Sequence, residues 1–510
     1  MAHPVPDDQR DTIAFLCRHA AYGDGIDRVE TIETHVSVVF LAGERAYKLK
    51  RAVRLPYLDF STVAQRREAC AAELALNRRT APALYLGVRR LGRNPAGGIG
   101  FSEDGTEVDW VVVMRRFDQS LLFDQLARAG KLAAPAIDAL ADHIALFHAA
   151  AEPRPGQGGA AALDAVAEEN RRCLAVAARA GFDDKDIAAI RERWRGAIDQ
   201  ATGLLERRRA DGKVRRCHGD LHLRNICLFE GQPTLFDCLE FSEPLASIDI
   251  LYDLAFLLMD LEHRGLGAFA NRVLNRYLDR TGEDDGLAAM PLFLSLRAGI
   301  RAHVTATALE HADSPETAAE AHRYLELAQR SLEPQPPRLV AIGGPSGSGK
   351  STLALALAPG LGRLPGARVL RSDVARKLLF GVAPETRLPQ GAYTPQVTRR
   401  VYERLARNAA TALAAGYSAI IDAVALTPQE RRRFAEIARR AGVPFTGLWL
   451  DADAAAMARR IDTRRNNASD ATAAILARQL RRDPGPIDWT RIDAGGGPQT
   501  TLAAARRALA

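Results

Sequence analysis

The sequence has few of the features that place a protein in a membrane or cross-link it. It has no run of about 18 apolar residues, so we expect no membrane span. The acidic opening MAHPVPDDQRD lacks the apolar segment of a secretory signal. The six cysteines form no C-x-x-C pair and no metal-ligand spacing, which argues against a disulfide framework and a thiolate metal site. We therefore expect a cytoplasmic protein with reduced thiols.

Length and charge indicate two different halves. The 510 residues exceed the roughly 250–300 at which a single core stops growing. Three prolines within 334–337 cannot continue a helix, so we predict domains 1–333 and 334–510. Residues 336–510 contain 27 Lys and Arg against 13 Asp and Glu, a charge of +14, which leaves −7 for the rest of a +7 chain. A basic half suits an anionic substrate, although Arg-rich solvated helices explain the charge equally well.

A glycine-rich octapeptide, Gly344-Pro-Ser-Gly-Ser-Gly-Lys-Ser351, fits the phosphate-binding pattern G-x-x-x-x-G-K-[S/T]. The apolar run 338–343 before it predicts a buried parallel strand, and 351–358 after it predict a helix. Such a loop surrounds phosphates with backbone N–H groups, while Lys350 neutralises their oxygens and Ser351 ligates Mg²⁺. The residues expected to hold the nucleotide are Gly344, Pro345, Ser346, Gly347, Ser348, Gly349, Lys350, Ser351 and Thr352.

Polar residues at the ends of later apolar runs are expected at the same site. The run 369–373 predicts a strand that ends in Ser-Asp, followed by Arg376 on the same helix face as Asp373. Asp373 would accept a hydroxyl proton and Arg376 would clamp an anionic group; the alternative is an N-capping aspartate with a surface arginine. The strand 418–422 ends at Asp422, a candidate ligand of Mg²⁺ or substrate.

An arginine cluster follows the strand 446–451 and the helix 453–461. Arg464 and Arg465 predict a lid that closes over the phosphates. With these motifs, residues 338–500 resemble the P-loop kinases that include gluconate kinase, adenylylsulfate kinase, the polynucleotide kinase phosphotransferase domain and zeta-type toxins. The pair Asp373 and Arg376 most resembles polynucleotide kinase. The resemblance implies a parallel α/β sheet flanked by helices and phosphoryl transfer from ATP to a hydroxyl group.

A second catalytic pattern lies in the first half. Residues 218–225 read His-Gly-Asp-Leu-His-Leu-Arg-Asn, and Asp237 follows twelve residues after Asn225. This is the H-x-D-x-x-x-x-N layout with a downstream aspartate that protein-kinase-like enzymes use. In that layout Asp220 accepts the proton of the attacking hydroxyl, while Asn225 and Asp237 hold Mg²⁺ against the phosphates.

The H-G-D-x-H form resembles aminoglycoside phosphotransferases and choline kinases over residues 20–330. The resemblance implies a bilobal protein-kinase-like fold, with a small lobe over 1–115 and a large lobe over 116–333. It also implies a strand lysine for ATP, Lys48 or alternatively Lys50, with a helical glutamate partner, Glu68 or alternatively Glu73. The strand 110–116 would enter the hinge, where the backbone at Met114 binds adenine. The segment 20–45 has no clear glycine-rich phosphate loop.

The two patterns together predict a bifunctional kinase that uses ATP and Mg²⁺ on small-molecule hydroxyl acceptors such as a sugar, an aminoglycoside-like compound or a nucleotide. The tandem resembles bacterial fusions of the two domain types. One alternative is a 5′-hydroxyl polynucleotide kinase with an accessory domain, although the C-terminal half has few aromatic residues for base stacking. Another is a P-loop ATPase regulated by a kinase-like sensor. No pattern specifies an oligomeric state.

Overall fold

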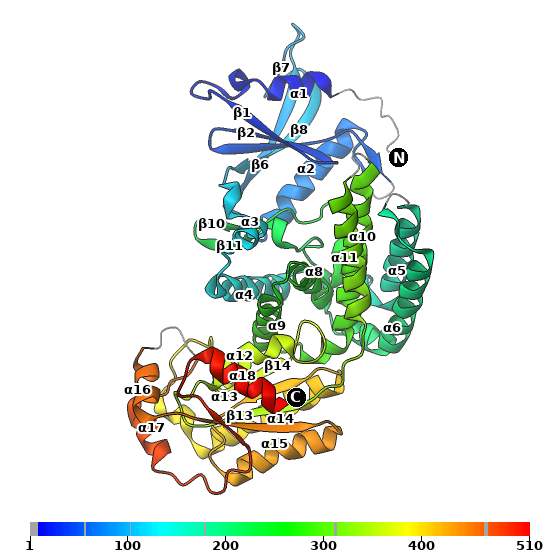
Figure 1. Ribbon diagram of the computed structural model, residues 1–510. Helices are drawn as coiled ribbons and strands as arrows, with labels where there is room; N and C mark the ends of the chain where they lie inside the picture. The colour runs from blue at the N-terminus through cyan, green and yellow to red at the C-terminus, as the bar shows by residue number, and fades with distance from the viewer. Residues whose placement is uncertain are drawn as a thin grey trace. The chain divides into compact units, whose positions relative to one another are not determined.

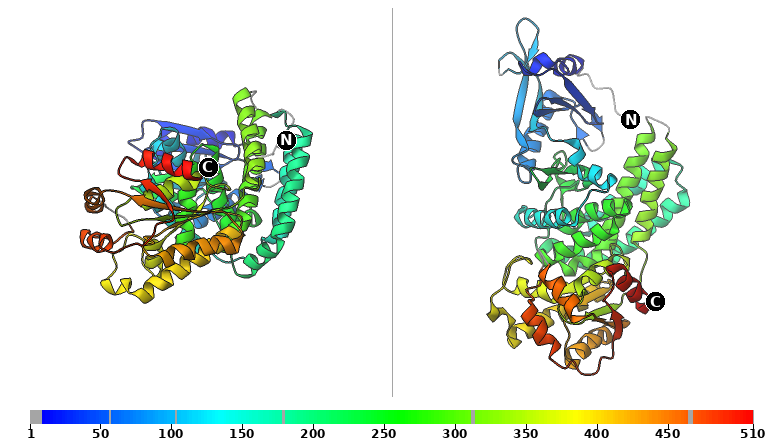
Figure 2. Two further views of the ribbon diagram at one scale, coloured as in Figure 1. Left: turned by 60° about the horizontal axis from the view of Figure 1, so that its bottom comes forward. Right: turned by 60° about the vertical axis from the view of Figure 1, so that its left-hand side comes forward.

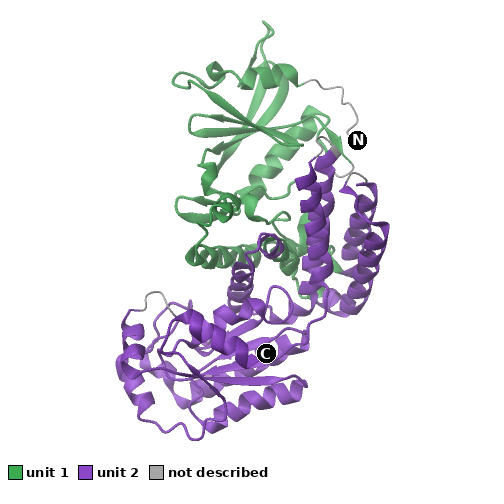
Figure 3. Cartoon of the chain, viewed as in Figure 1, with its two compact units in different colours: residues 1–159, 208–257 green, residues 160–207, 258–510 purple. Residues whose placement is uncertain are grey.

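The computed structural model describes residues 9–55, 58–102, 104–177, 180–310, 314–463 and 468–509. By its internal contacts the chain divides into two compact units, residues 1–159 with 208–257 and residues 160–207 with 258–510 (Figure 3). The predicted boundary at 333/334 falls inside the second unit, so the division into domains 1–333 and 334–510 stays a prediction. The expected fold class is confirmed, since the first unit contains an antiparallel sheet and the second a parallel α/β sheet.

A six-stranded antiparallel sheet, with strand order β1-β2-β3-β8-β6-β7, forms the top layer of the first unit (Figure 1). Its strands are β1 (Val29–Glu33), β2 (Ser37–Ala42), β3 (Arg45–Lys50), β6 (Tyr85–Arg93), β7 (Ile99–Gly100) and β8 (Thr106–Arg115). Side chains alternate between the two faces of a strand. In β3, Tyr47 and Leu49 therefore join the apolar cluster on one face, while Lys48 and Lys50 point to the other.

Helix α2 (Val63–Asn77) covers the lysine face of this sheet. It begins at a capping box, in which the side chains of Thr62 and Gln65 each accept from the other's backbone N–H. Every third or fourth residue of the helix is buried, in the order Arg66, Cys70, Glu73 and Asn77. This buried stripe is mainly polar, so α2 contacts the sheet through ion pairs and hydrogen bonds and not only through apolar packing.

The rest of the first unit supplies short hairpins and loops around a few helices. Its further elements are α1 (Arg10–Leu16), η1 (His19–Tyr22), β4 (Arg54–Leu55), β5 (Leu58–Asp59), η2 (Gln119–Leu121), α3 (Phe123–Arg128), α4 (Ala134–Ala150), β9 (Val214–Arg216), η4 (Leu223–Asn225), β10 (Ile226–Phe229), β11 (Gln232–Leu235), α7 (Glu243–Ala246), β12 (Ser247–Asp249) and the start of α8 (Ile250–His263). Strands β10 and β11 pair as an antiparallel hairpin. The hairpin brings the residues that precede β10 close to those that follow β11.

The second unit begins with a group of helices. They are α5 (Gly159–Val176), α6 (Asp184–Ala210), α9 (Gly267–Thr281), η5 (Asp284–Ala289), α10 (Met290–Thr307), η6 (Ala308–Glu310) and α11 (Pro315–Ser331). Helices α10 and α11, light green in Figure 2, lie side by side. Buried polar contacts fix α5 and α6 to α10: the Asn170 side-chain amide donates to the Leu296 carbonyl (3.0 Å) and Trp194 Nε1 donates to Ser295 Oγ (2.8 Å).

A five-stranded parallel sheet follows, with strand order β14-β15-β13-β16-β17. Its elements in chain order are β13 (Leu339–Gly343), α12 (Lys350–Leu357), η7 (Ala358–Gly360), β14 (Arg368–Arg371), α13 (Ser372–Leu379), η8 (Gln390–Tyr393), α14 (Pro395–Ala414), β15 (Ala419–Asp422), α15 (Pro428–Ala441), β16 (Phe445–Asp451), α16 (Ala454–Asp462), α17 (Ala473–Leu480), β17 (Thr490–Asp493) and α18 (Pro498–Leu509). The strands and helices that the sequence predicts for the P-loop half are found in this order.

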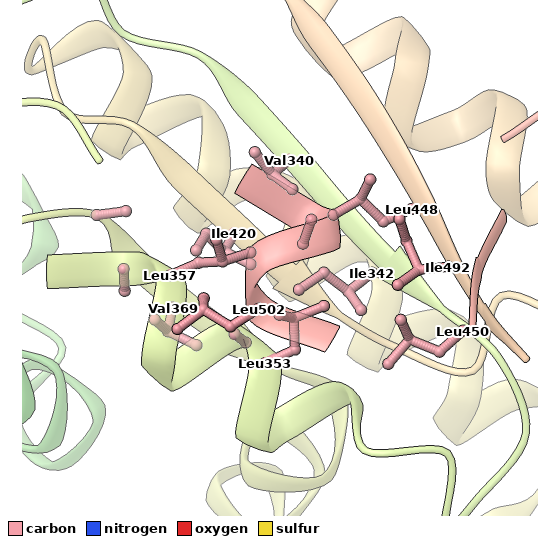
Figure 4. Close-up of a cluster of buried hydrophobic side chains, with 14 of the residues drawn as sticks. Val340, Ile342, Leu353, Leu357, Val369, Ile420, Leu448, Leu450, Ile492 and Leu502 are labelled. Carbon is pink, nitrogen blue, oxygen red and sulfur yellow. The ribbon is translucent and has the colours of Figure 1, made fainter. Parts of the chain in front are cut away.

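Helices cover both faces of the parallel sheet. On one face, Leu353 of α12 and Leu502 of α18 pack against alternate strand residues such as Val340 and Ile342 (Figure 4). On the other, α14 and α15 place Tyr402 and Phe434 in a stacked pair with ring centroids 5.5 Å apart. A sheet buried on both faces accounts for the continuous apolar runs of its strands. Within the part of the chain that the structure describes, no helix is both long and apolar enough to cross a membrane.

Candidate active sites

The glycine-rich loop connects the end of β13 to α12, as its sequence predicts. Gly347 of this loop is required by space as well as by conformation, since it has φ +85° and a Cβ there would lie 2.5 Å from the Met457 carbonyl oxygen. Lys350 is buried and its Nζ donates to the Pro345 carbonyl (2.8 Å). The lysine therefore folds back over the loop whose N–H groups would surround a phosphate.

A hydroxyl and a carboxylate meet beside this loop. Ser351 Oγ, in the first turn of α12, donates to Asp422 Oδ2 at the carboxyl end of β15 (2.5 Å). Arg371, at the end of the neighbouring strand β14, has its Nε 3.7 Å from the same carboxylate oxygen. The two oxygen ligands that the sequence predicts for a metal, one at the start of α12 and one at the carboxyl end of β15, are thus brought together.

Asp373 and Arg376 lie at the start of helix α13, as expected for the pair. The expected strand 369–373 stops at Arg371, because Ser372 begins the helix. Burial raises the pKa of Asp373, and the nearby charge of Asp422 raises it further. Arg376 is buried: its Nη1 donates to the Ala392 carbonyl (2.8 Å), and its guanidinium lies 4.8 Å from the centroid of the Tyr393 ring.

The predicted lid falls partly outside the described residues, and this includes both Arg464 and Arg465. The last residue of the predicted lid, which spans 463–470, is Asp470; its carboxylate accepts from Lys377 Nζ and Tyr393 Oη in close contacts, and from the Leu388 N–H (3.1 Å). One carboxylate therefore connects the end of the predicted lid with α13 and η8.

A glutamine that the sequence motifs do not mark contacts the phosphate loop. The Ser346 N–H donates to Gln479 Oε1 of α17 (2.8 Å). No motif identifies Gln479, because its partner lies 133 residues away in the chain. Its position makes α17 part of the candidate nucleotide site.

In the first unit, the residues around Asp220 form a tightly bonded loop. Asn225 Nδ2 donates to the Asp220 carboxylate (2.8 Å) and to its carbonyl (2.9 Å). The buried Asp253 of α8 accepts from the N–H groups of His218 (3.1 Å) and Gly219 (2.9 Å). These bonds hold the loop from both sides, so that Asp220 and Asn225 keep a fixed separation.

The two strand lysines enter a cluster of three carboxylates, of which Glu73 and Glu240 are buried and Asp237 is partly exposed. Lys48 Nζ lies 2.9 Å from Glu73 Oε1 and 2.5 Å from Asp237 Oδ1. Lys50 Nζ makes close ion pairs with Glu73 and with Glu240. Burial favours the neutral amine of Lys48, but the charges of Asp237 and Glu73 outweigh it and raise its pKa. Both lysines are thus present at one site, with Lys48 nearer to Asp237.

The expected partner Glu68 is wrong. Glu68 is exposed on α2, whereas Glu73 lies on the buried stripe and binds both lysines. Five residues at about 100° each separate the two glutamates by roughly 140° around the helix, so only one faces the sheet. Glu73 shares the three- and four-residue spacing of Arg66, Cys70 and Asn77, but most of this stripe is polar, so no apolar periodicity marks it as buried in the sequence.

Asp237 has a left-handed backbone, φ +62°, which is uncommon outside glycine and clusters at functional sites. Its N–H donates to the Tyr85 hydroxyl (3.2 Å), and the next N–H, of Cys238, donates to Asn77 Oδ1 (2.8 Å). Met114 lies in β8, paired with Ala46 of β3 and Tyr85 of β6. The adenine-binding role of the Met114 backbone stays a prediction.

A bilobal arrangement of a strand lysine, a helical glutamate and an H-x-D-x-x-x-x-N loop defines a protein-kinase-like phosphotransferase, and a phosphate loop on a parallel sheet defines a P-loop kinase. Comparison with known proteins agrees with both. Residues 44–293 match the model of the phosphotransferase enzyme family, and residues 339–485 match that of an AAA domain. Both domains belong to kinase families, which use ATP, so the chain is a phosphotransferase.

The chain belongs to the same two-domain family as uncharacterized proteins of Mycobacterium tuberculosis and Mycobacterium bovis. It is 34% identical to each over 483 residues, which cover 92% of this chain and 93% of theirs.

Among solved structures, a choline/ethanolamine kinase family protein from Mesorhizobium loti is 15% identical and covers 63% of this chain and 94% of its own (TM-score 0.40). A gluconokinase from Sinorhizobium meliloti is 22% identical and covers 34% and 94% (TM-score 0.23). An APS kinase from Mycobacterium tuberculosis, solved with AMPPNP and APS, is 19% identical and covers 35% and 99% (TM-score 0.26).

Proposed function

We propose that the chain is a bifunctional ATP-dependent kinase, in which each half transfers a γ-phosphate to a hydroxyl group of a small molecule. One observation carries the proposal. Each unit has an aspartate that we assign as the proton acceptor, a lysine, and a second aspartate that we assign to the metal: Asp220, Lys48 and Asp237 in the first unit, and Asp373, Lys350 and Asp422 in the second.

In the first site, Asp220 accepts the proton of the acceptor hydroxyl as its oxygen attacks the γ-phosphorus. The bond between that phosphorus and the β–γ bridging oxygen breaks, and ADP leaves. Lys48 neutralises the phosphate oxygens while Glu73 holds it in place. The backbone near Met114 would bind adenine.

In the second site, Asp373 takes the hydroxyl proton and Arg376 orients the acceptor. The raised pKa of Asp373 strengthens it as a base, because a more basic carboxylate binds the transferred proton more tightly. The loop from Gly344 to Thr352 binds the phosphates, and Lys350 moves from the Pro345 carbonyl to their oxygens. The lid arginines Arg464 and Arg465 would add positive charge over the transferred group.

The donor chemistry of both sites fits Mg²⁺. Asn225 and Asp237 offer an amide oxygen and a carboxylate, and Ser351 and Asp422 offer a hydroxyl and a carboxylate 2.5 Å apart. Oxygen ligands of this kind are the ones that Mg²⁺ prefers when it also binds phosphates. The bound ion would neutralise the charge that develops on the phosphate oxygens.

A phosphorylation screen with γ-labelled ATP and a pool of small metabolites tests the proposal. The wild-type chain should label acceptors that Asp220→Asn loses and Lys350→Ala keeps, together with others that show the opposite pattern. If every labelled acceptor survives Asp220→Asn and disappears with Lys350→Ala, the first unit is a sensor and not a kinase. If a 5′-hydroxyl oligonucleotide added to the pool is labelled by the P-loop half, and its labelling falls steeply with salt, the polynucleotide kinase alternative holds for that half.

A further inference from the structure

Strand β14 lies at the edge of the parallel sheet, yet the outward backbone groups of Ala367 and Val369 are bonded. On the inner side, the Arg368 N–H donates to the Ser418 carbonyl just before β15 (2.9 Å). On the outer side, the Val369 N–H donates to Asn275 Oδ1 of α9 (2.7 Å), and Asn275 Nδ2 donates to the Ala367 carbonyl (3.1 Å). One side-chain amide thus supplies the acceptor and the donor that a neighbouring strand would supply.

Other residues on the same face of α9 extend this contact. Asn271, one turn before Asn275, also donates to the Ala367 carbonyl (3.0 Å). Asp279, one turn after it, binds Arg368 Nη1 (2.7 Å), and Asp284 of η5 binds Arg368 Nε (2.6 Å). Arg368 is only 2% exposed, so it needs both carboxylates to offset its burial.

The covered strand leads directly to the P-loop active site. Its last residue, Arg371, pairs in register with Asp422 on β15, whose carboxylate accepts from Ser351. The next residues begin α13, which carries Asp373. A shift of β14 along or away from β15 would therefore move the proposed base relative to the proposed metal ligands.

Helix α9 also holds the segment that follows α13. Arg276 forms two bonds with the Glu385 carboxylate, at 2.7 and 3.3 Å. Three residues later, the Leu388 N–H donates to Asp470, which binds Tyr393 beside Arg376. The helix is thus bonded to the chain on both sides of α13.

We infer that α9 is a structural part of the P-loop kinase, and that Asn275 and Arg368 are positioning residues that hold Asp373 against Asp422 for phosphoryl transfer. The inference rests on the proposed role of that site. It assigns to residues 267–284, which precede the P-loop half in sequence, the task of closing the open edge of its sheet.

Hydrogen exchange in the full-length chain tests the contact without needing activity. Asn275→Ala leaves the buried Val369 N–H without an acceptor, so exchange in peptides covering 366–376 should become roughly 10- to 100-fold faster. Asn170→Ala is the matched control: Asn170 is equally buried and bridges α5 to α10 with two hydrogen bonds, but it does not touch the parallel sheet. Equal exchange of 366–376 in the two variants would overturn the inference.

Activity provides the second readout. In a chain that also carries Asp220→Asn, ATP hydrolysis that depends on Lys350 should show a kcat lower by roughly 10-fold or more for Asn275→Ala, with KM for ATP little changed. Arg368→Lys, which keeps the charge, should lie between wild type and Asn275→Ala. An unchanged kcat in Asn275→Ala, with accelerated exchange, would contradict the positioning role. If the parent chain, which carries only Asp220→Asn, shows no ATP hydrolysis that depends on Lys350, the result counts against the proposed function. The hydrogen-exchange comparison would still test the contact between α9 and β14.

Discussion

Replacing Glu73 by glutamine should weaken the first active site far more than the same change at Glu68. Glu73 is fully buried and is shared by Lys48 and Lys50. Removing one partner of a buried ion pair costs about 3–5 kcal/mol. Each lysine here keeps a second carboxylate, Asp237 or Glu240, and glutamine still accepts hydrogen bonds. We therefore expect Glu73→Gln to cost about 2 kcal/mol of transition-state stabilisation at this site. This is a fall of roughly 30-fold in kcat/KM, since about 1.4 kcal/mol corresponds to a factor of ten.

The assay is label transfer from γ-labelled ATP in a chain that also carries Lys350→Ala, so that only the first site contributes. Glu73→Gln should lower kcat/KM by that factor, mainly through weaker positioning of Lys48. Glu68→Gln is the matched control on the same helix, and as an exposed change it should stay within about 0.5 kcal/mol, roughly twofold. Equal effects of the two substitutions, or a loss of less than about threefold for Glu73→Gln, would refute the role of the buried stripe.

Three further predictions concern pH and metal. Burial opposes ionisation of Glu73, but Lys48 and Lys50 outweigh it and lower its pKa from 4.5 to about 2. The ionised Glu73 therefore contributes its full stability above pH 4.5, and this contribution is lost as the pH falls toward 2. Urea midpoints measured across this range should depend less on pH in Glu73→Gln than in wild type. Because the pKa of Asp373 is raised from 3.8, the rate of phosphoryl transfer at the P-loop site should increase with pH through an apparent pKa above 3.8. Asp373→Asn should remove this pH dependence and lower kcat roughly 10²- to 10⁴-fold, while ATP binding persists. Ser351→Ala should raise the Mg²⁺ concentration needed for half-maximal P-loop activity by roughly 10-fold, as half the hydroxyl–carboxylate pair is lost, and an unchanged Mg²⁺ titration would contradict the assignment.

Local patterns identify the residues that we propose to bind phosphate or to accept a proton. The phosphate loop and its strand–loop–helix setting are legible because the pattern spans eight residues with fixed chemistry. The H-x-D-x-x-x-x-N loop is equally local, and the structure joins Asn225 to Asp220 within five residues. Glu68 and Glu73 are distinguished by the structure, which buries the helix face that Glu73 shares with Arg66, Cys70 and Asn77.

Partners far apart in sequence leave no such pattern. Gln479 reaches the loop across 133 residues and Asn275 reaches β14 across 94 residues, and neither belongs to a motif. Both side chains bind a backbone N–H group in a distant part of the chain, and the sequence does not show which backbone groups need a partner. The edge of a parallel sheet is nevertheless a predictable need, because its outward N–H and C=O groups require partners. A helix with Asn, Asn and Asp at four-residue spacing, as at 271, 275 and 279, is a sequence that can meet that need, since these side chains lie in one row along the helix. In this family, the search for what completes the P-loop kinase should therefore begin in the helices that precede it.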